Sequence, residues 1–220
     1  MNRTGKAISL STIALLGIFL LSACGTNNAS SSASSGATST HQSTGATQKI
    51  SQASGPSEKP VAPEKSPPGD IPDTQAFVTY TSQQGNYKVE VPEGWARTAK
   101  AGDASFVNKL DGMSVTLKNS SRAPSVGSVR KNQVPTLKKA QRAVQITHIQ
   151  SVNTPAGQAV LIKYTSNSNP DPVTGKQVRL ENNSYLFFKN GKLATLRLYA
   201  PLGADNVDQW NRISQSFRWM

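Results

Sequence analysis

The sequence is poor in cysteine, histidine and long apolar runs. Cys24 is the only cysteine among 220 residues, so an intrachain disulfide is excluded and the fold must be stable through packing alone. Crossing a bilayer takes roughly 20 consecutive apolar residues. The stretch from Ala7 to Leu21 is shorter and is interrupted by Gly17. We therefore expect no permanent transmembrane helix there.

The first 23 residues instead have the layout of a secretory signal. Arg3 and Lys6 precede the mostly apolar stretch, and small residues follow it. The tetrapeptide Leu-Ser-Ala-Cys that ends at Cys24 resembles the lipobox of bacterial lipoproteins. This resemblance implies that the Cys24 thiolate forms a thioether to a diacylglyceryl group and that cleavage leaves Cys24 as the first residue. The alternative is that Cys24 is a free thiol inside an ordinary signal, which is cleaved after an A-x-A-like site.

Composition divides the rest of the chain in two. Residues 24–73 are rich in Ser, Thr, Ala and Gly, then in Pro, and contain no aromatic residue. This segment buries too little apolar surface to offset the conformational entropy that an ordered backbone would lose. We therefore predict a disordered tether behind the lipidated Cys24. Residues 74–220 contain all three tryptophans and have the length of one globular domain.

Alternation of apolar and polar residues predicts several strands in this domain. The clearest lie at residues 87–91, 105–110, 113–117, 144–152, 159–166, 185–189 and 192–199. Asn190-Gly191 favours a type I′ hairpin turn, and Asp111-Gly112 suits a second tight hairpin. The sheet is expected to be mainly antiparallel.

Two segments are predicted to be helical. The first runs roughly from Ser125 to Ala140, where Pro135 must end, kink or restart the helix. In the second, Asp205 is the expected N-cap, and apolar residues recur at helical spacing after it. These residues are Val207, Trp210, Ile213 and Phe217.

The domain resembles the PsbP-like superfamily, which includes the photosystem II subunit PsbP, nuclear-import factors that bind Ran, and many bacterial lipoproteins. Four matches carry the resemblance: residues 80–95 ending in Pro-x-Gly-Trp, the central helix, the Asn190-Gly191 hairpin and the closing segment 210–219. The resemblance implies an α+β fold in which a mainly antiparallel β-sheet is packed between helices, an α/β/α sandwich. None of the four motifs is catalytic, and a shared scaffold does not by itself give a function.

Catalytic groups are scarce. His41 falls in the tether, and His148 in a predicted strand is interpreted as a partly buried strand residue. A lipidated Cys24 cannot act as a nucleophile. Glu90 and Glu93 are expected to solvate a surface rather than to form an acid and base pair.

Metal and cofactor motifs are absent from the sequence as well. The loop at residues 169–175 holds one carboxylate, which is too little charge for a good calcium site, and there is no phosphate-binding glycine loop. We therefore expect no cofactor and no metal.

Positive charge is the feature of the domain that indicates binding. Because Arg3 and Lys6 leave with the signal, the 24 basic residues fall to 22 against 12 acidic ones, a formal charge of +10. Around the central helix, six basic residues follow one another without an acid, and a helix would place most of them opposite its apolar arc. They are Arg122, Arg130, Lys131, Lys138, Lys139 and Arg142. They are either a docking face for an anionic partner or a solvated helix face.

The sequence thus favours a monomeric, non-enzymatic lipoprotein on the extracytoplasmic face of the cell membrane, whose domain is a binding or assembly module for an envelope protein complex. The second hypothesis is an adaptor that binds anionic lipid or cell-wall polymer through the basic helix. An enzyme is the third, but no acid, base and nucleophile set can be named for it. Nucleic acid is not an expected partner, because the basic segment has no interleaved aromatic residues for base stacking.

Overall fold

The computed structural model describes residues 58–220. Cys24, His41 and the rest of the predicted signal and tether up to residue 57 lie outside the described residues. The strands are β1 (Phe77–Ser82), β2 (Tyr87–Pro92), β3 (Ala96–Lys100), β4 (Asp103–Asn108), β5 (Asp111–Asn119), β6 (Arg142–Thr154), β7 (Gly157–Asn167), β8 (Arg179–Lys189), β9 (Lys192–Pro201) and β10 (Arg218–Trp219). The helical segments are α1 (Val126–Ser128), the π-turn η1 (Val129–Gln133), α2 (Val134–Ala140) and α3 (Val207–Ser216).

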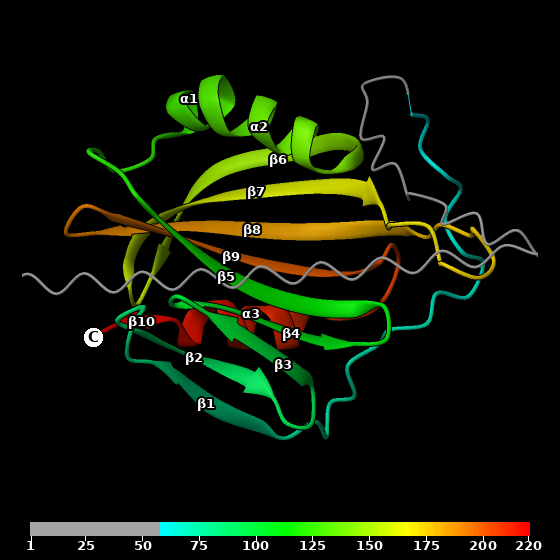
Figure 1. The fold of residues 1–220 in the computed structure, drawn as a ribbon, viewed down its shortest axis with the longest axis horizontal. Coiled ribbons are helices and arrows are strands. Elements are labelled where there is room, and N and C mark those ends of the chain that lie inside the picture. The colour runs from blue at the N-terminus through cyan, green and yellow to red at the C-terminus, as the bar shows by residue number, and fades with distance from the viewer. Residues whose placement is uncertain (1–57) are drawn as a thin grey trace, which may run out of the picture. The chain divides into compact units, whose positions relative to one another are not determined.

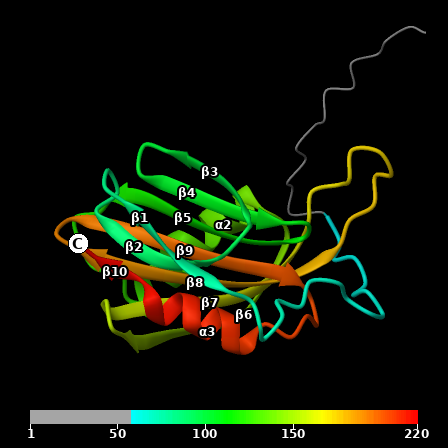
Figure 2. The same ribbon diagram turned by 90° about the horizontal axis from the view of Figure 1, so that it is seen from below.

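Two antiparallel sheets form the domain, which confirms the expected α+β class (Figure 1). The larger has seven strands in the order β3-β4-β5-β9-β8-β7-β6, and the smaller has three in the order β1-β2-β10. Figure 2 shows α3 lying along the underside of the larger sheet, close to the smaller one. The sequence predicted the antiparallel sheet and both helical segments but not a separate second sheet.

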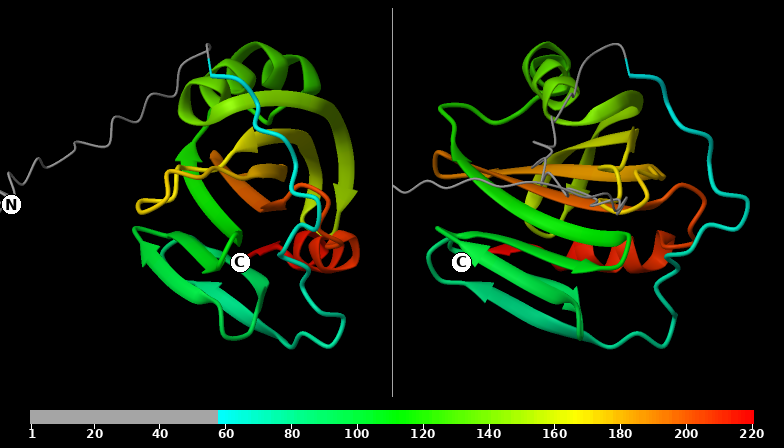
Figure 3. Two further views of the ribbon diagram at one scale, coloured as in Figure 1. Left: turned by 90° about the vertical axis from the view of Figure 1, so that its right-hand side faces the viewer. Right: turned by 45° about the vertical axis from the view of Figure 1, so that its right-hand side comes forward.

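The central strands of the seven-stranded sheet are covered on both faces, so the sheet carries two hydrophobic cores, whereas the outer strand β3 is exposed. On one face, α3 and the small sheet cover a core built around Tyr87, Phe187 and Phe217. Phe217 stacks on the other two, with ring centroids 5.6 Å from Tyr87 and 4.3 Å from Phe187. On the other face, the α1–α2 segment covers a smaller core that includes Val129 and Leu186 (Figure 3). Alternating residues of one strand therefore serve opposite cores.

The central helix has the predicted extent, from Ser125 to Ala140. Ser125 is its N-cap: the Ser125 hydroxyl accepts from the Ser128 amide at 3.1 Å, and the Ser125 amide donates to the Ser128 hydroxyl at 2.9 Å. Pro135 does not end the helical segment: after the π-turn, the α-helix restarts at Val134 with Pro135 in its first turn, one of the predicted outcomes. Proline has no amide hydrogen and its ring crowds the preceding turn, and here the preceding turn is widened into a π-turn, in which the Val134 amide bonds the Val129 carbonyl.

The second helix differs from its prediction at the N-terminus. Asn206 precedes the first turn in place of Asp205, and its side chain does not cap the helix. Instead it accepts a hydrogen bond from the Ile71 amide at 2.6 Å and donates one to the Gly69 carbonyl at 2.8 Å. Val207 is 73% exposed, so α3 packs into the core only from its second turn onward.

One predicted hairpin turn is confirmed and the other is wrong. Asn190 and Gly191 have φ angles of 49° and 76°, as a type I′ turn between β8 and β9 requires. The β4–β5 turn, in contrast, is made by Lys109 and Leu110, while Asp111 and Gly112 belong to β5. Gly112 is needed for space, because a Cβ there would overlap the Tyr199 hydroxyl of the neighbouring strand.

Residues 58–73, here called the N-terminal strap, are packed on the domain, so the prediction of a disordered tether up to residue 73 is wrong for this part. The Val61 amide donates to Asn167 Oδ1 at 3.1 Å, and Ile71 is buried in the first core. The partners of Val61 and Ile71 lie 106 and 135 residues further along the chain. The packed part of the chain therefore begins before Thr74.

The outer strand β6 is irregular. Its pairing with β7 shifts register between Arg142 and Gln145 and again between Ile146 and His148, and Ala143 has a φ angle of 45°. Arg179 of β8 secures the first irregularity, donating to the Ala143 carbonyl at 2.8 Å and to Gln145 Oε1 at 2.9 Å.

Within residues 58–220, no helix combines the length and the apolar character that a membrane crossing requires.

Candidate functional site

The outer face of the α1–α2 segment and the loop before it carry exposed positive charge. Val129 is fully buried on the inner side, as the amphipathic pattern predicts. The five exposed basic residues are Arg122, Arg130, Lys131, Lys138 and Lys139, here called the basic helix face. Among residues 58–220, no carboxylate oxygen lies within 4.0 Å of any of their charged nitrogens. Their charge is therefore presented to solvent without a local counter-ion.

Arg142, the sixth basic residue of the predicted set, is placed differently. It opens β6, and its side chain is only 17% exposed. Arg142 Nη2 lies 3.0 Å from Glu58 Oε2, and Nε donates to Glu58 Oε1 at 3.2 Å. Its charge is thus balanced by the N-terminal strap, and Arg142 does not belong to the basic helix face.

Two lysines that the sequence analysis did not single out extend the positive surface. Lys189 and Lys192 flank the tip of the β8–β9 hairpin and are exposed. The tip lies against the loop that leads to α1, because the Ser120 amide donates to the Gly191 carbonyl at 2.8 Å. The sequence signal for a positive surface broader than the helix is that residues 112–170 contain eight basic residues and no acidic residue.

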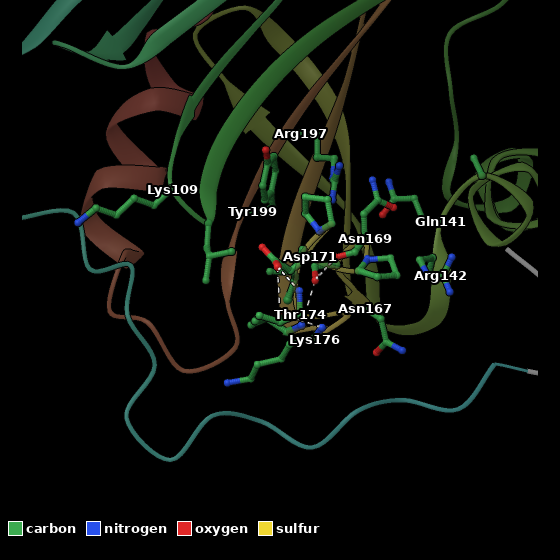
Figure 4. Close-up of a pocket in the computed structure, with 17 residues that line it drawn as sticks. Lys109, Gln141, Arg142, Asn167, Asn169, Asp171, Thr174, Lys176, Arg197 and Tyr199 are labelled. Carbon is green, nitrogen blue, oxygen red and sulfur yellow. Dashed lines mark hydrogen bonds between the residues drawn. The ribbon is translucent and has the colours of Figure 1, made fainter. Parts of the chain in front are cut away.

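A pocket of about 730 Å³ opens between the end of α2, the β4–β5 turn, the loop after β7 and strand β9 (Figure 4). Its wall on β9 consists of Arg197 and Tyr199. The remaining wall is mainly polar or basic. It includes Lys109, Gln141, Arg142, Asn167, Asn169, Asp171, Thr174 and Lys176. The sequence alone does not indicate this pocket, because its walls come from segments far apart in the chain.

Arg197 is held in place on the pocket wall by Asn182 and Tyr199. Its Nε and Nη2 both donate to Asn182 Oδ1, at 2.9 and 2.7 Å. Its guanidinium carbon lies 4.4 Å from the centre of the Tyr199 ring. Asn182 is itself buried and donates to the Ser166 hydroxyl at 3.1 Å. Burial raises the pKa of Tyr199, and Arg197 opposes that rise, so Tyr199 stays a neutral phenol.

Asp171 is the only carboxylate in the pocket wall. Its Oδ1 accepts from the amides of Val173 and Thr174 and from the Thr174 hydroxyl, at 3.0, 2.8 and 3.0 Å. The hydrogen bonds from Thr174 and Val173 lower the pKa of this exposed carboxyl. Asp171 therefore stabilises the loop at residues 169–175 through hydrogen bonds to its own backbone and side chains. In the region that the structure describes, no three His, Cys, Asp or Glu side chains lie together as a metal site would require.

The other sequence candidates for chemistry lie apart from one another. His148 is exposed rather than partly buried, with a ring nitrogen 3.0 Å from Gln150 Oε1. Glu90 accepts from Arg212 Nε at 2.7 Å, and Glu93 lies exposed in the following turn. No pair of these groups is arranged as an acid and a base within hydrogen-bonding distance.

The similarity to solved structures is a similarity of fold. No protein-family model matches the sequence, and no curated protein matches it. The solution structure of cyanobacterial PsbP (CyanoP) from Synechocystis matches 69% of this chain and 98% of its own, with 16% identity and a TM-score of 0.51. The domain therefore has a PsbP-like α+β fold. Two weaker similarities are the Ran-binding protein Mog1p of Saccharomyces cerevisiae, with 10% identity, 66% and 96% coverage and a TM-score of 0.47, and a Pseudomonas aeruginosa protein of unknown function, with 12% identity, 64% and 94% coverage and a TM-score of 0.42.

Proposed function

We propose that this chain is a non-enzymatic lipoprotein, anchored through diacylated Cys24 outside the cytoplasmic membrane, whose domain docks on an acidic surface of an envelope protein complex. The observation that carries the proposal is the basic helix face, five exposed cations without a counter-ion among residues 58–220. Complementary charge steers association and selects the partner. The PsbP-like scaffold is compatible with such a role but does not establish it.

The absence of enzymatic activity belongs to the same proposal. Two observations support it. His148, Glu90 and Glu93 lie apart from one another, and Asp171 accepts hydrogen bonds from its own loop. Turnover of any envelope substrate that is lost when His148 or Glu90 is replaced would contradict it.

The docking proposal is tested by crosslinking in intact cells. A photoreactive residue at Asn132, which is exposed beside Lys131, should give a discrete protein adduct, whereas one at exposed Asp208 on α3 should not. Replacing Arg130, Lys131, Lys138 and Lys139 by Gln should abolish the adduct and its sensitivity to salt.

A matched control removes the same charge elsewhere. Lys59, Lys65, Lys88 and Lys100 are exposed and lie outside the basic helix face, so their replacement by Gln should leave the adduct intact. Equal loss in both quadruple variants would mean that net charge, and not this surface, governs binding.

Anchoring is tested separately. A Cys24→Ala variant should move from the membrane fraction to the soluble fraction, because two acyl chains give stable membrane attachment and their loss leaves none. A variant that stays in the membrane fraction and migrates like the wild type would refute lipidation at Cys24.

A second partner is favoured by the hairpin tip. Lys189 and Lys192 widen the basic surface beyond one helix, and a broad basic surface suits an anionic lipid layer or a polyanionic wall polymer. Salt-sensitive sedimentation of the chain with anionic vesicles, in the absence of any protein adduct, would favour this partner over a protein complex.

A further inference from the structure

We propose that the pocket beside β9 binds a small organic acid, with Arg197 as the anchor for its carboxylate or phosphate group. This site is separate from the basic helix face and does not depend on the docking function. About 730 Å³ lies within the range of roughly 300–1,000 Å³ that is common for small-molecule sites.

The charges around the pocket favour an anion. Arg142 and Lys176 also line it, but each is paired with an acid of the N-terminal strap: Glu58 lies 3.0 Å from Arg142, and Glu64 lies 3.1 Å from Lys176. Arg197 has no such partner, since the group that holds it is the neutral amide of Asn182. The cation that faces the pocket from the sheet is thus left without a balancing charge in the described part of the chain.

Arg197 also has the geometry of a prepared anchor. Asn182 Oδ1 accepts one hydrogen bond from Nε and one from Nη2. The Tyr199 ring also contacts the guanidinium through a cation–π interaction. No hydrogen bond from Nη1 is found within residues 58–220, so donors remain for a ligand. A planar guanidinium fork matches a carboxylate or phosphate, and an arginine that is already ordered loses little entropy on binding.

The rest of the wall indicates what the anion is attached to. Leu110, Pro170 and Pro172 contribute apolar surface, while Gln141 and Asn169 contribute amides. A cationic ligand is disfavoured, because the single carboxylate of the wall, Asp171, already accepts three hydrogen bonds from its own loop. An organic acid with a compact, partly apolar body fits this lining better than an inorganic ion alone.

Calorimetric titration of the full chain tests this site. The probes are sn-glycerol 3-phosphate for the phosphate source, succinate for the carboxylate source, and glycerol as the neutral control. We expect saturable binding of at least one acid and none of glycerol. The acid that binds identifies the class of ligand.

Two variants of the anchor locate the binding. Arg197→Gln should weaken binding about tenfold or more, because it removes charged hydrogen bonds to the ligand. Arg197→Lys should weaken it as well, because lysine keeps the charge but cannot form the fork. Lys138→Gln with Lys139→Gln, on the basic helix face, should leave the affinity unchanged, and thermal unfolding checks that each variant is folded.

A measurement on the wild type covers the case in which the Arg197 variants do not fold. In ¹⁵N spectra, the acid should shift the Arg197 Nε signal and the amides of the loop at residues 169–175, and it should leave the amides of α1 and η1, which do not line the pocket, in place. The proposal is overturned if neither acid saturates, if the Arg197→Gln affinity equals that of the wild type, or if the shifts fall on α1 and η1.

Discussion

Asp111 is a carboxyl group in an unfavourable environment. Its side chain is 5% exposed, and its Oδ1 has no hydrogen-bond donor among residues 58–220. Burial, and then the negative charge of Asp70, raise the pKa of Asp111 to about 7, while Lys109 opposes the rise. In the unfolded chain an aspartate titrates near 4, so the folded state binds this proton more tightly. The resulting stability is complete below about pH 4 and is lost as the pH rises through about 7.

An Asp111→Asn variant should lose this pH dependence, because a neutral amide of the same shape replaces the carboxyl group. We expect its free energy of unfolding to exceed that of the wild type by roughly 2–4 kcal/mol at about pH 8 and to differ little at about pH 4. Urea denaturation at both pH values measures the difference. Asp208→Asn, at an exposed site on α3, is the control and should leave the pH profile unchanged.

Two glycines should respond oppositely to the same substitution. Gly112→Ala places a methyl group against the Tyr199 hydroxyl, and overpacking of this kind costs roughly 1–3 kcal/mol of stability. Gly127→Ala in α1 meets almost open space and restricts the unfolded chain, so it should stabilise by roughly 0.5–1 kcal/mol. Thermal unfolding of both variants measures the contrast, and a stable Gly112→Ala protein would mean that the Tyr199 ring moves freely.

At the scale of elements, Glu58 holds the N-terminal strap to the start of β6. Burial opposes its ionisation, but hydrogen bonds from Asn167, Gln177 and Arg142, with the charge of Arg142, lower the pKa of Glu58 overall. Because this pKa is depressed on folding, the stabilisation is present above about pH 4.3 and is lost as the pH falls. The strap is therefore attached most firmly near neutral pH.

A Glu58→Gln variant should loosen the strap without unfolding the domain. We expect the Val61 amide, which bonds Asn167 Oδ1, to exchange its hydrogen about tenfold faster or more, because local opening becomes easier. Glu64→Gln is the matched control: its partner Lys176 is 65% exposed, and exposed pairs contribute about 0–1 kcal/mol. Equal exchange in the two variants would show that the buried pair does not hold the strap.

What the sequence predicts about the elements depends on how local the physics is. Alternation gave β2, β7 and β9, and Asn190-Gly191 gave the hairpin, because strand faces and turn angles are set by neighbouring residues. The strap is not predicted because Ile71 and Glu58 find their partners 84 or more residues away, in segments that composition alone does not connect. Arg197 is a different case: Tyr199 is two residues away on β9 and Asn182 lies across the β8–β9 hairpin, but the pocket that Arg197 lines is completed by the end of α2 and the loop after β7.

Arg142 and Asp111 differ from their predictions for another reason. The residues beside them predict a basic run for Arg142 and a turn dipeptide for Asp111. In the fold, Arg142 pairs with Glu58 of the strap, and Asp111 belongs to β5 and lies beside Gly69 of the strap. Basic residues of the same run that stay on the helix, such as Lys138 and Lys139, are placed where the helical period predicts.

At the scale of the whole molecule, one sheet links the two cores. Leu186 and Phe187 are adjacent in β8 and face opposite cores, and they are 2% and 1% exposed. A cavity left by a smaller side chain at either position therefore disturbs the backbone of β8, which both cores share. Trp210 belongs to the first core, and Trp95 and Trp219 pack against it, so tryptophan fluorescence reports on that side alone.

Leu186→Ala should lower the stability of both cores together, by roughly 2–5 kcal/mol. The shift should be equal when unfolding is followed by tryptophan fluorescence and by far-ultraviolet circular dichroism, as in a two-state transition. Val207→Ala, at a site that is 73% exposed, is the control and should shift neither signal appreciably. A fluorescence transition that stays in place while the dichroism transition moves would show that the two cores unfold independently.

The irregular course of β6 matters when many copies of the domain lie side by side. A long, regular outer strand offers its free amides and carbonyls to the outer strand of a neighbouring copy, which is a route to fibrous aggregates. In β6 the two register shifts interrupt that row, and Arg179 secures the first of them from within the sheet. On this side of the sheet, a neighbouring copy therefore meets no continuous strand edge on which to pair.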